Sequence, residues 1–204
     1  MNLGKRYYSD AEAKRTIVEI GRRMYEKGFV SANDGNISIL VEENVLWTTP
    51  TMVSKGFMTE DMLVKVDLDS NRLEGECCPS SELKMHLRVY QENPAVRAVT
   101  HAHPPYSTAF AIANIPLEEP FLAEAVTNLG KVPVASYAVP GTQQVPDSVA
   151  PYCKDYHAVL LQNHGALTWG KTPLEAYYRL ESLEFYAREM LLTKYIIGKQ
   201  TLIG

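Results

Sequence analysis

Three short β-rich runs follow one another between residues 31 and 69, and they limit the possible folds more than any other feature. The runs are ISIL, VLWTT and LVKVDL, and turn-forming residues such as Asn33-Asp34-Gly35 and Glu42-Glu43-Asn44 separate them. Connections this short resemble hairpins rather than crossover helices. The sequence also lacks the GxGxxG and GxxxxGKS/T motifs of nucleotide-binding folds. We therefore expect a largely antiparallel or mixed sheet rather than a regular βαβα fold.

Helical patterns lie at both ends of the chain and between the later strands. Ser9 and Glu12 form a capping-box motif, which predicts a helix from residue 9 to about residue 28. Further helices are expected from Ser80 or Ser81 to residue 92, after Pro104-Pro105, over residues 145–156, and from Thr172 through YAREMLLTKYI. Strands are expected over residues 98–103, in VPVASYA and in AVLLQNHGALTW. Residues 1–204 are thus predicted to form one α/β domain, a three-layer αβα fold with a central, mainly antiparallel sheet.

Charge and composition exclude several classes of protein. The 20 Lys and Arg against 24 Asp and Glu give a net charge of −4, so nucleic acid is not expected as a partner. No apolar run approaches the roughly 18 residues that span a bilayer, and MNLGKRYYSD does not resemble a secretory signal. The three cysteines, Cys77, Cys78 and Cys153, have no CxxC spacing, which argues against a disulfide framework and a thiolate zinc site. We expect a cytoplasmic protein with reduced thiols and no membrane contact.

The spacing of the histidines predicts a metal site. His101 and His103 flank Ala102 in an expected strand, so their side chains share one face, with Cα atoms roughly 6 to 7 Å apart. His164 ends the apolar run AVLLQN and precedes Gly165, a residue that permits a close backbone approach. Three neutral imidazoles with an open fourth position are typical of catalytic zinc. A single histidine is more often a hydrogen-bonded or solvated residue, and this is how we interpret His86 and His157.

Three polar segments could hold an anion near such a metal. The segment Pro79-Ser80-Ser81-Glu82 begins an expected helix, where amide donors favour an anion and a carboxylate could reach a bound substrate. Helix capping is the simpler interpretation, but it accounts for only one of the two serines. The loops Asn33-Asp34-Gly35-Asn36 and Thr48-Thr49-Pro50-Thr51 could cradle the same anion, although turn formation alone would explain either of them.

Taken in order, these motifs resemble a known family. They are Asp34-Gly35-Asn36-Ile37-Ser38, Thr49-Pro50-Thr51, Pro79-Ser80-Ser81-Glu82 with His86 four residues on, His101-Ala102-His103, and Gln162-Asn163-His164-Gly165. The chain resembles the class II aldolase and adducin-head family over nearly its whole length. Within this family it is most similar to the aldolases of L-fuculose 1-phosphate.

The resemblance implies an αβα fold and a homotetramer with active sites between subunits. It also implies one Zn²⁺ per subunit, or another divalent metal, on His101, His103 and His164. Glu82 would be the acid/base residue and a candidate fourth ligand. The substrate phosphate would be bound by Gly35, Asn36, Thr51, Ser80 and Ser81. The implied reaction is reversible cleavage of a sugar phosphate, a ketose 1-phosphate such as L-fuculose 1-phosphate or a 5-deoxypentulose 1-phosphate, into dihydroxyacetone phosphate and an aldehyde.

Four departures from the aldolase pattern concern the phosphate loop and the aldehyde side. Asn33 replaces a threonine, and Met52 replaces a glycine, so the loop would differ in shape if its backbone needs a positive φ. No tyrosine occurs in residues 118–121, where the aldolases have a catalytic one, and the chain ends soon after Tyr195. Glutamate at position 82 favours an aldolase over the related epimerases, which have aspartate there.

Three other interpretations stay open. The chain could be a methylthioribulose-1-phosphate dehydratase, which uses a similar histidine site, or a sugar-acid phosphate decarboxylase. The third is a non-catalytic assembly module of the adducin type. The adducin branch lacks the metal histidines, so the presence of all three favours an enzyme.

Overall fold

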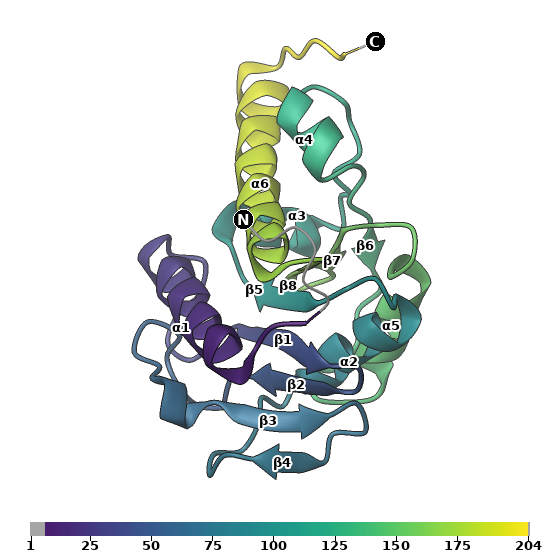
Figure 1. Cartoon of the computed structure of the whole chain (residues 1–204). Helices are drawn as coiled ribbons and strands as arrows, with labels where there is room; N and C mark the ends of the chain where they lie inside the picture. The colour runs from purple at the N-terminus through teal and green to yellow at the C-terminus, as the bar shows by residue number, and fades with distance from the viewer. Residues whose placement is uncertain (1–6, 204) are drawn as a thin grey trace.

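A mixed sheet of eight strands crosses the molecule in the computed structural model, which describes residues 7–203 (Figure 1). The strands are β1 (Asn36–Glu42), β2 (Val45–Thr48), β3 (Val64–Asp67), β4 (Arg72–Glu74), β5 (Ala98–Ala102), β6 (Val134–Ala135), β7 (Ala158–Leu161) and β8 (Gly165–Gly170). Their order across the sheet is β4-β3-β2-β1-β5-β8-β7-β6. All described neighbours pair antiparallel except β6 and β7. The mainly antiparallel sheet expected from the hairpin-like runs is therefore confirmed.

Helices cover both faces of this sheet. The α-helices are α1 (Asp10–Glu26), α2 (Leu83–Glu92), α3 (Pro105–Ala113), α4 (Ala123–Asn128), α5 (Gln144–Val149) and α6 (Pro173–Met190). Short 3-10 helices, η1 (Glu60–Met62) and η2 (Ala150–Tyr152), and a π-helical segment, η3 (Leu191–Ile197), complete the elements. Helices α1, α3, α4 and α6 share one hydrophobic core, and α2 and α5 share the other. The three-layer αβα arrangement is confirmed.

Alternation along the strands builds the two cores. In β8, Ala166 packs in the core of α6, whereas Leu167 and Trp169 pack in the core of α2. In β5, Ala98 and Val99 divide between the two cores in the same way.

The first helix begins as its capping motif predicts. The Ser9 side chain accepts a hydrogen bond from the Glu12 amide, and the Glu12 carboxylate accepts one from the Ser9 amide at 3.0 Å. Its apolar stripe, which includes Ile17 and Ile20, is fully buried against β1 and its neighbours.

Several expected boundaries are wrong, each for a local reason. Helix α2 begins at Leu83, because Pro79 pairs with Pro50 and the Ser80 amide bonds to the Thr49 carbonyl, which keeps this backbone extended. The strand expected in VPVASYA shrinks to β6, and the helix expected over residues 145–156 is α5 followed by η2, where Pro151 cannot donate. Strand β4 and helix α4 are additional to the expected elements.

Two broader expectations can be compared with the structure. Within residues 7–203, every helix is too short or too polar to cross a membrane. All three cysteines are free thiols, and burial raises the pKa of Cys153 to about 12. A buried thiol of this kind is protonated and unreactive at neutral pH.

Candidate metal and substrate site

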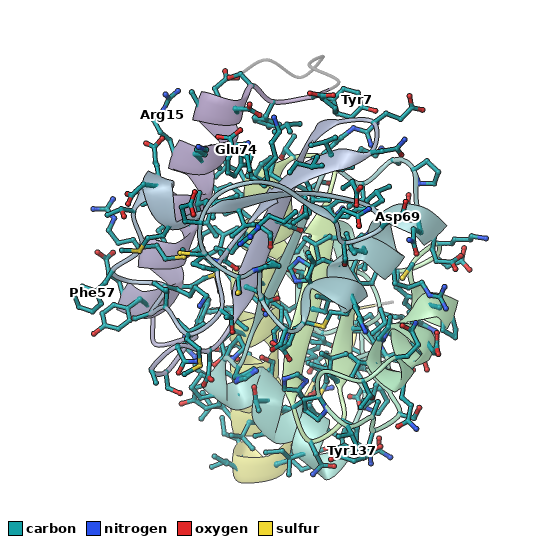
Figure 2. The ribbon with its side chains drawn as sticks, turned by 90° about the horizontal axis from the view of Figure 1, so that it is seen from below. Tyr7, Arg15, Phe57, Asp69, Glu74 and Tyr137 are labelled. Atoms are coloured by element: carbon teal, nitrogen blue, oxygen red, sulfur yellow. The ribbon has the colours of Figure 1, made fainter. Side chains whose placement is uncertain are left out.

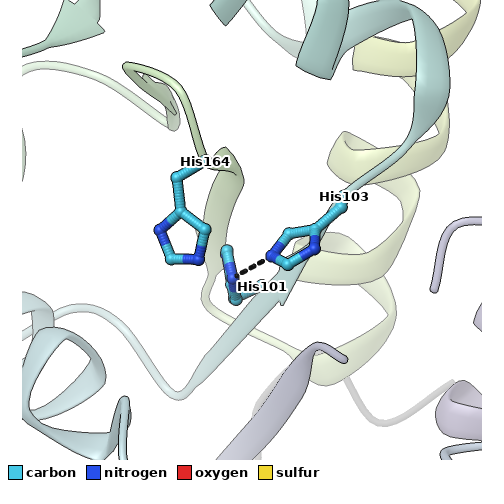
Figure 3. Close-up of side chains that lie close together, drawn as sticks. All are labelled: His101, His103 and His164. Atoms are coloured by element: carbon cyan, nitrogen blue, oxygen red, sulfur yellow. Dashed lines mark hydrogen bonds between the residues drawn. The ribbon is translucent and has the colours of Figure 1, made fainter. Parts of the chain in front are cut away.

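Three histidines from two segments of the chain, His101 and His103 from one and His164 from the other, meet at one end of the central strands (Figure 3). One ring nitrogen from each of His101, His103 and His164 lies within 4.8 Å of the other two. The Nε2 atoms of His101 and His103 are 3.1 Å apart. Within residues 7–203, these three side chains are the one group of three or more His, Cys, Asp or Glu residues that lie close enough together to hold a metal ion.

The sheet register brings these histidines together. His101 lies in β5 opposite Leu167 of β8, so the turn between β7 and β8 carries His164 alongside it. His103 lies just beyond β5, and its amide donates to the Phe29 carbonyl at 2.9 Å. Gly165 is needed here because a Cβ at this position would lie 2.5 Å from the Ala102 carbonyl oxygen.

Neighbouring acceptors orient two of the imidazoles. His101 Nδ1 lies 2.9 Å from the Ala166 carbonyl oxygen. Because a carbonyl can only accept, Nδ1 carries the proton and Nε2 keeps its lone pair toward the cluster. His103 Nδ1 lies 3.5 Å from the Asp34 carboxylate, which also accepts a hydrogen bond from Ser31.

The donor set fits a divalent cation. Burial, together with repulsion between the protonated forms of His101 and of His103 and His164, holds the pKa of His101 well below its usual value, although Glu82 opposes this. Burial also lowers the pKa of His103. Both imidazoles are therefore neutral, which is the form that binds metal, and three such donors leave a position for a substrate oxygen. The three histidines could bind a metal ion.

Glu82 brings a carboxylate against the histidine cluster. Its Oε1 atom lies 2.9 Å from His164 Nε2, and its Oε2 atom lies 3.5 Å from His101 Nε2 and accepts a bond from Asn36 Nδ2 at 2.8 Å. Burial by itself raises the pKa of Glu82, but electrostatic interactions with His101 and His164 and hydrogen bonds from His164 and Asn36 lower it by more, so the net shift is downward. The carboxylate is ionised at neutral pH.

A cavity of about 330 Å³ opens beside this cluster. The residues that the resemblance assigns to phosphate all line it, namely Gly35, Asn36, Thr51, Ser80 and Ser81. Glu82, His103 and His164 line it as well, while the His101 side chain is fully buried. The structure therefore brings the predicted carboxylate, anion-binding residues and two of the three histidines to the wall of one cavity.

The walls of the cavity are fixed by hydrogen bonds between loops. The Thr51 amide donates to the Cys78 carbonyl at 3.0 Å, so the two predicted anion loops run side by side. Asn36 Nδ2 donates to Ser80 Oγ at 3.2 Å and thereby joins β1 to the serine segment. Gly35 has φ +75, and a Cβ there would lie 2.9 Å from the His101 carbonyl oxygen. The two serines of this wall, Ser80 and Ser81, lie in a turn before α2 and not in the first turn of the helix.

Sequence reasoning missed Lys55, Pro140 and Gly141, which also line the cavity. Lys55 has no motif of its own. The available signal was a single lysine in the turn-rich segment that follows Thr49-Pro50-Thr51. Asp34 was singled out only as part of a loop, and its position beside His103 depends on tertiary structure.

His86 and His157 lie outside the metal-binding group. His86 Nδ1 lies 2.8 Å from Ser38 Oγ, which in turn lies 2.8 Å from the Tyr90 hydroxyl. Burial lowers the pKa of His86 to about 3, so the ring is neutral. This histidine belongs to a buried polar network between β1 and α2.

The segment without a tyrosine, residues 118–121, packs against the C-terminal end of the same chain. Lys194 and Gln200 donate to the Glu119 carboxylate, and the Tyr186 hydroxyl donates to the Glu119 carbonyl at 2.7 Å. The rings of Phe121 and Tyr186 lie 5.0 Å apart. Residues near the end of the chain therefore fold back onto this segment.

The protein therefore has an αβα fold in which three histidines and a carboxylate lie beside one cavity. This arrangement is typical of metal-dependent enzymes. Residues 15–191 match the family described as Class II Aldolase and Adducin N-terminal domain. The chain belongs to the class II aldolase and adducin family.

Named relatives fall into two groups. The chain is 32% identical over 184 residues to the 3-oxo-tetronate 4-phosphate decarboxylase of Pectobacterium atrosepticum, covering 88% of this chain and 84% of that protein. It is 35% identical over 181 residues to the L-fuculose phosphate aldolase of Methanococcus maripaludis, covering 89% and 95%. The crystal structure of L-fuculose-1-phosphate aldolase from Thermus thermophilus matches with a TM-score of 0.81 at 28% identity, over 93% of this chain and 98% of that chain. These relatives support a lyase-type enzyme.

Proposed function

We propose that this chain is a divalent-metal-dependent lyase that cleaves a ketose 1-phosphate reversibly into dihydroxyacetone phosphate and an aldehyde. The observation that carries the proposal is the position of Glu82. Its carboxylate contacts two histidines of the candidate metal group and lines the same cavity as the anion loops. A proton-transfer group, a cation site and an anion site therefore lie within the length of one small sugar phosphate.

The chain's own residues would bind and orient the phosphate end of the substrate. The Ser80 and Ser81 hydroxyls, the backbone near Gly35 and the Thr51 side chain would provide hydrogen-bond donors along one wall, and Asn36 holds Ser80 and Glu82 in place there. With the phosphate held there, the carbonyl carbon beside it would lie toward the histidines. A divalent cation on His101, His103 and His164, zinc by our expectation, would supply a Lewis acid that polarises the carbonyl.

Glu82 would move the proton at carbon. In the direction of synthesis, its ionised carboxylate removes a proton from the hydroxymethyl carbon next to the carbonyl of dihydroxyacetone phosphate. The electron pair released forms the new carbon–carbon bond with the aldehyde, whose oxygen takes up a proton from solvent. In cleavage the same steps run backwards, and Glu82 returns the proton to that carbon.

Decarboxylation of a 3-oxo-tetronate 4-phosphate is a second candidate, because relatives of both kinds match this chain at similar identity. The two reactions need the same proton transfer. When the bond to the carboxylate carbon breaks, carbon dioxide leaves and the electron pair stays on the carbon next to the ketone. Protonation of that carbon again gives dihydroxyacetone phosphate. One site can therefore serve either reaction, and the second product identifies which one occurs.

The test is product analysis with purified, zinc-loaded protein. We would supply L-fuculose 1-phosphate, a 5-deoxypentulose 1-phosphate, methylthioribulose 1-phosphate and 3-oxo-tetronate 4-phosphate, and measure dihydroxyacetone phosphate, aldehyde and carbon dioxide separately. An aldolase releases dihydroxyacetone phosphate without carbon dioxide, and a decarboxylase releases both in equal amounts. A dehydratase releases neither.

Variants test the assigned residues in the same assay. Glu82→Gln should lose about 10²- to 10⁴-fold in turnover while still binding zinc, because general acid–base catalysis contributes on this order. His164→Ala should lose zinc itself. Full activity of Glu82→Gln, or no product from any of the four substrates with zinc bound, would overturn the proposal.

We also propose that the chain forms a homotetramer with active sites at subunit interfaces. Several large apolar side chains are exposed on the single chain, and Phe57 and Tyr137 project at the rim of the molecule (Figure 2). Tyr195, Ile196 and Ile197 near the C-terminal end are exposed as well. Exposed apolar groups of this kind are typical of protein interfaces. Light scattering of the purified protein measures the oligomeric state, and a monomer at working concentration would contradict this part.

A further inference from the structure

Lys55 places an ammonium group in the wall of the candidate substrate cavity. The residue is only 1% exposed, although it lies in a connecting segment between β2 and η1. It is the single lysine or arginine among the described residues that line this cavity, whereas Asp34 and Glu82 both contribute carboxylates. A positive charge in this position needs an explanation beyond packing, because a methionine of similar length would fill the same space without losing hydration.

The neighbours of the ammonium do not neutralise its charge. Lys55 Nζ donates to the carbonyl of Asn33 at 2.9 Å and to the carbonyl of Val53 at 2.6 Å. These bonds use two of the three donors of the ammonium group. Burial lowers the pKa of Lys55 to about 8, despite the opposing charges of Asp34 and Glu82. The carbonyl partners of the ammonium are uncharged, and the carboxylates of Asp34 and Glu82 act on it from a greater distance.

The two carbonyls belong to the two loops that flank the cavity. Asn33 lies in the loop before β1, and Val53 lies in the loop after β2. Both loops line the cavity, the first through Gly35 and the second through Thr51. The ammonium thus connects the two loops, and Lys55 lines the cavity that they flank.

The backbone of Lys55 is held in place by α1. A Cβ at Gly21 of α1 would lie 2.8 Å from the Lys55 carbonyl oxygen and 2.5 Å from Met58 Cε. Helix and loop therefore approach so closely at this point that only glycine fits. A lysine anchored in this way presents its charge at a fixed position. This favours binding of an anion in one defined place over non-specific attraction of anions to the surface.

We propose that Lys55 is the specificity-determining cation of this cavity, and that its ammonium selects substrates carrying a phosphate monoester dianion. The inference rests on the proposed function for the identity of the substrate, but the binding of the anion does not depend on the reaction. A dianion near Lys55 supplies the charge that Asn33 and Val53 do not, and it uses the remaining donor. A neutral sugar gains neither interaction.

The test compares Lys55→Met with Lys55→Arg, which keeps the charge, and with Lys27→Met, which removes an exposed lysine at the end of α1. For each zinc-loaded protein we would measure kcat/KM for the best sugar phosphate and for the same sugar without phosphate. Lys55→Met should lose about 30-fold or more on the phosphorylated substrate, as expected for a charged hydrogen bond, and no more than about 3-fold on the other. Lys55→Arg should recover part of the loss, and Lys27→Met should match the wild type.

A binding measurement separates this inference from the proposed function. Equilibrium dialysis with inorganic phosphate at constant ionic strength should show saturable binding to the wild type that weakens about 30-fold in Lys55→Met. If no substrate is turned over but phosphate binding follows this pattern, the proposed reaction fails and the role of Lys55 stands. Equal losses with and without the substrate phosphate, or unchanged phosphate binding by Lys55→Met, would overturn it.

Wild-type protein provides a measurement that no folding defect can affect. With ¹³C-labelled lysine, the Lys55 side-chain signal should shift when phosphate is added, because a bound dianion raises the pKa of the ammonium. The Lys27 signal should not move. A Lys55 signal that is insensitive to saturating phosphate would also overturn the inference.

Discussion

At the scale of single residues, Met52 takes a backbone conformation that side chains usually avoid. Its φ is +60, and its side chain is 78% exposed beside the candidate anion loop. The Asn33 amide donates only a long bond to its sulfur, at 3.6 Å. The backbone at this position therefore has the positive φ that a glycine would adopt freely, even though methionine occupies it.

Replacing Met52 by glycine should therefore stabilise the protein. We expect Met52→Gly to raise the free energy of unfolding by about 0.5 to 1 kcal/mol, since relief of the left-handed strain exceeds the added entropy of the unfolded chain. Urea denaturation measures this. Ser54→Gly, two residues away and without a positive φ, is the matched control and should lose stability. If both variants are destabilised equally, Met52 is not strained.

The sequence was informative about residues whose chemistry depends on spacing. The HxH pair and the His164-Gly165 turn were enough to predict which three histidines meet, since strand periodicity determines the faces. The position of Glu82 followed from its motif. Lys55 could not be predicted in this way, because its burial results from the contact between α1 and a loop far along the chain. The roles of all these residues in binding and catalysis stay predictions.

At the scale of elements, helix α3 begins two residues after a candidate metal ligand. His103 is followed by Pro104 and by α3, whose first amides have no partner within the helix. Glu184 of α6, which is buried, accepts bonds from the amides of Tyr106 and Ser107 at 2.9 and 2.8 Å and from the Ser107 hydroxyl at 2.9 Å. A carboxylate in this position also complements the positive end of the helix dipole.

Removing the Glu184 charge should loosen both the helix and the candidate metal site. We expect Glu184→Gln to cost about 1 to 3 kcal/mol in the free energy of unfolding, because an amide cannot accept these bonds with both of its polar atoms. Zinc affinity should fall several-fold, as it does when groups that support a ligand are lost. Glu181→Gln, on the same helix but paired with exposed Lys27, is the control. Equal stability and equal zinc affinity in the two variants would refute the role of Glu184.

Element types were easier to predict than element boundaries. The capping box of α1 and the hairpin-like runs of β1 to β3 depend on local interactions, so the sequence pattern was sufficient. The start of α2 depends on the pairing of Pro79 with Pro50, which is a tertiary contact. The short strand β6 likewise ends where the Tyr137 amide bonds to the Gln162 side chain instead of to a strand.

At the scale of the whole molecule, the three histidines connect the end of β5 to the turn between β7 and β8, so a bound ion would link neighbouring strands that are far apart in sequence. Removing it with a chelator should lower the melting temperature. If zinc is present at about 100 times its dissociation constant, it contributes about 2.7 kcal/mol. For a domain of this size that corresponds to roughly 5 to 10 °C.

Differential scanning calorimetry with and without chelator measures this shift. The His164→Ala variant is the control, because its melting temperature should not respond to chelator or to added zinc. A wild-type melting temperature that is unchanged by a chelator shown to remove all zinc would contradict a stabilising metal at this position.

The layered architecture was predictable from the sequence because hairpin-like connections, helices between strands and strong apolar runs all indicate it. The order of the strands was not, since pairing of β1 with β5 joins segments separated by three further strands, a 3-10 helix and α2. The membership of the family follows from the sequence match over residues 15–191.

The pairing of β1 with β5 has a further consequence for how the site comes into being. Among the strand pairs described in residues 7–203, it alone joins the four-stranded part built from β1 to β4 with the part built from β5 to β8. Asn36, which holds Glu82, pairs with His101 across this seam. On the ribosome, the first part is complete before any of the three histidines has been made. The cavity therefore takes shape only when the two halves dock, because Gly35, Asn36 and Thr51 come from the first half and the three histidines from the second.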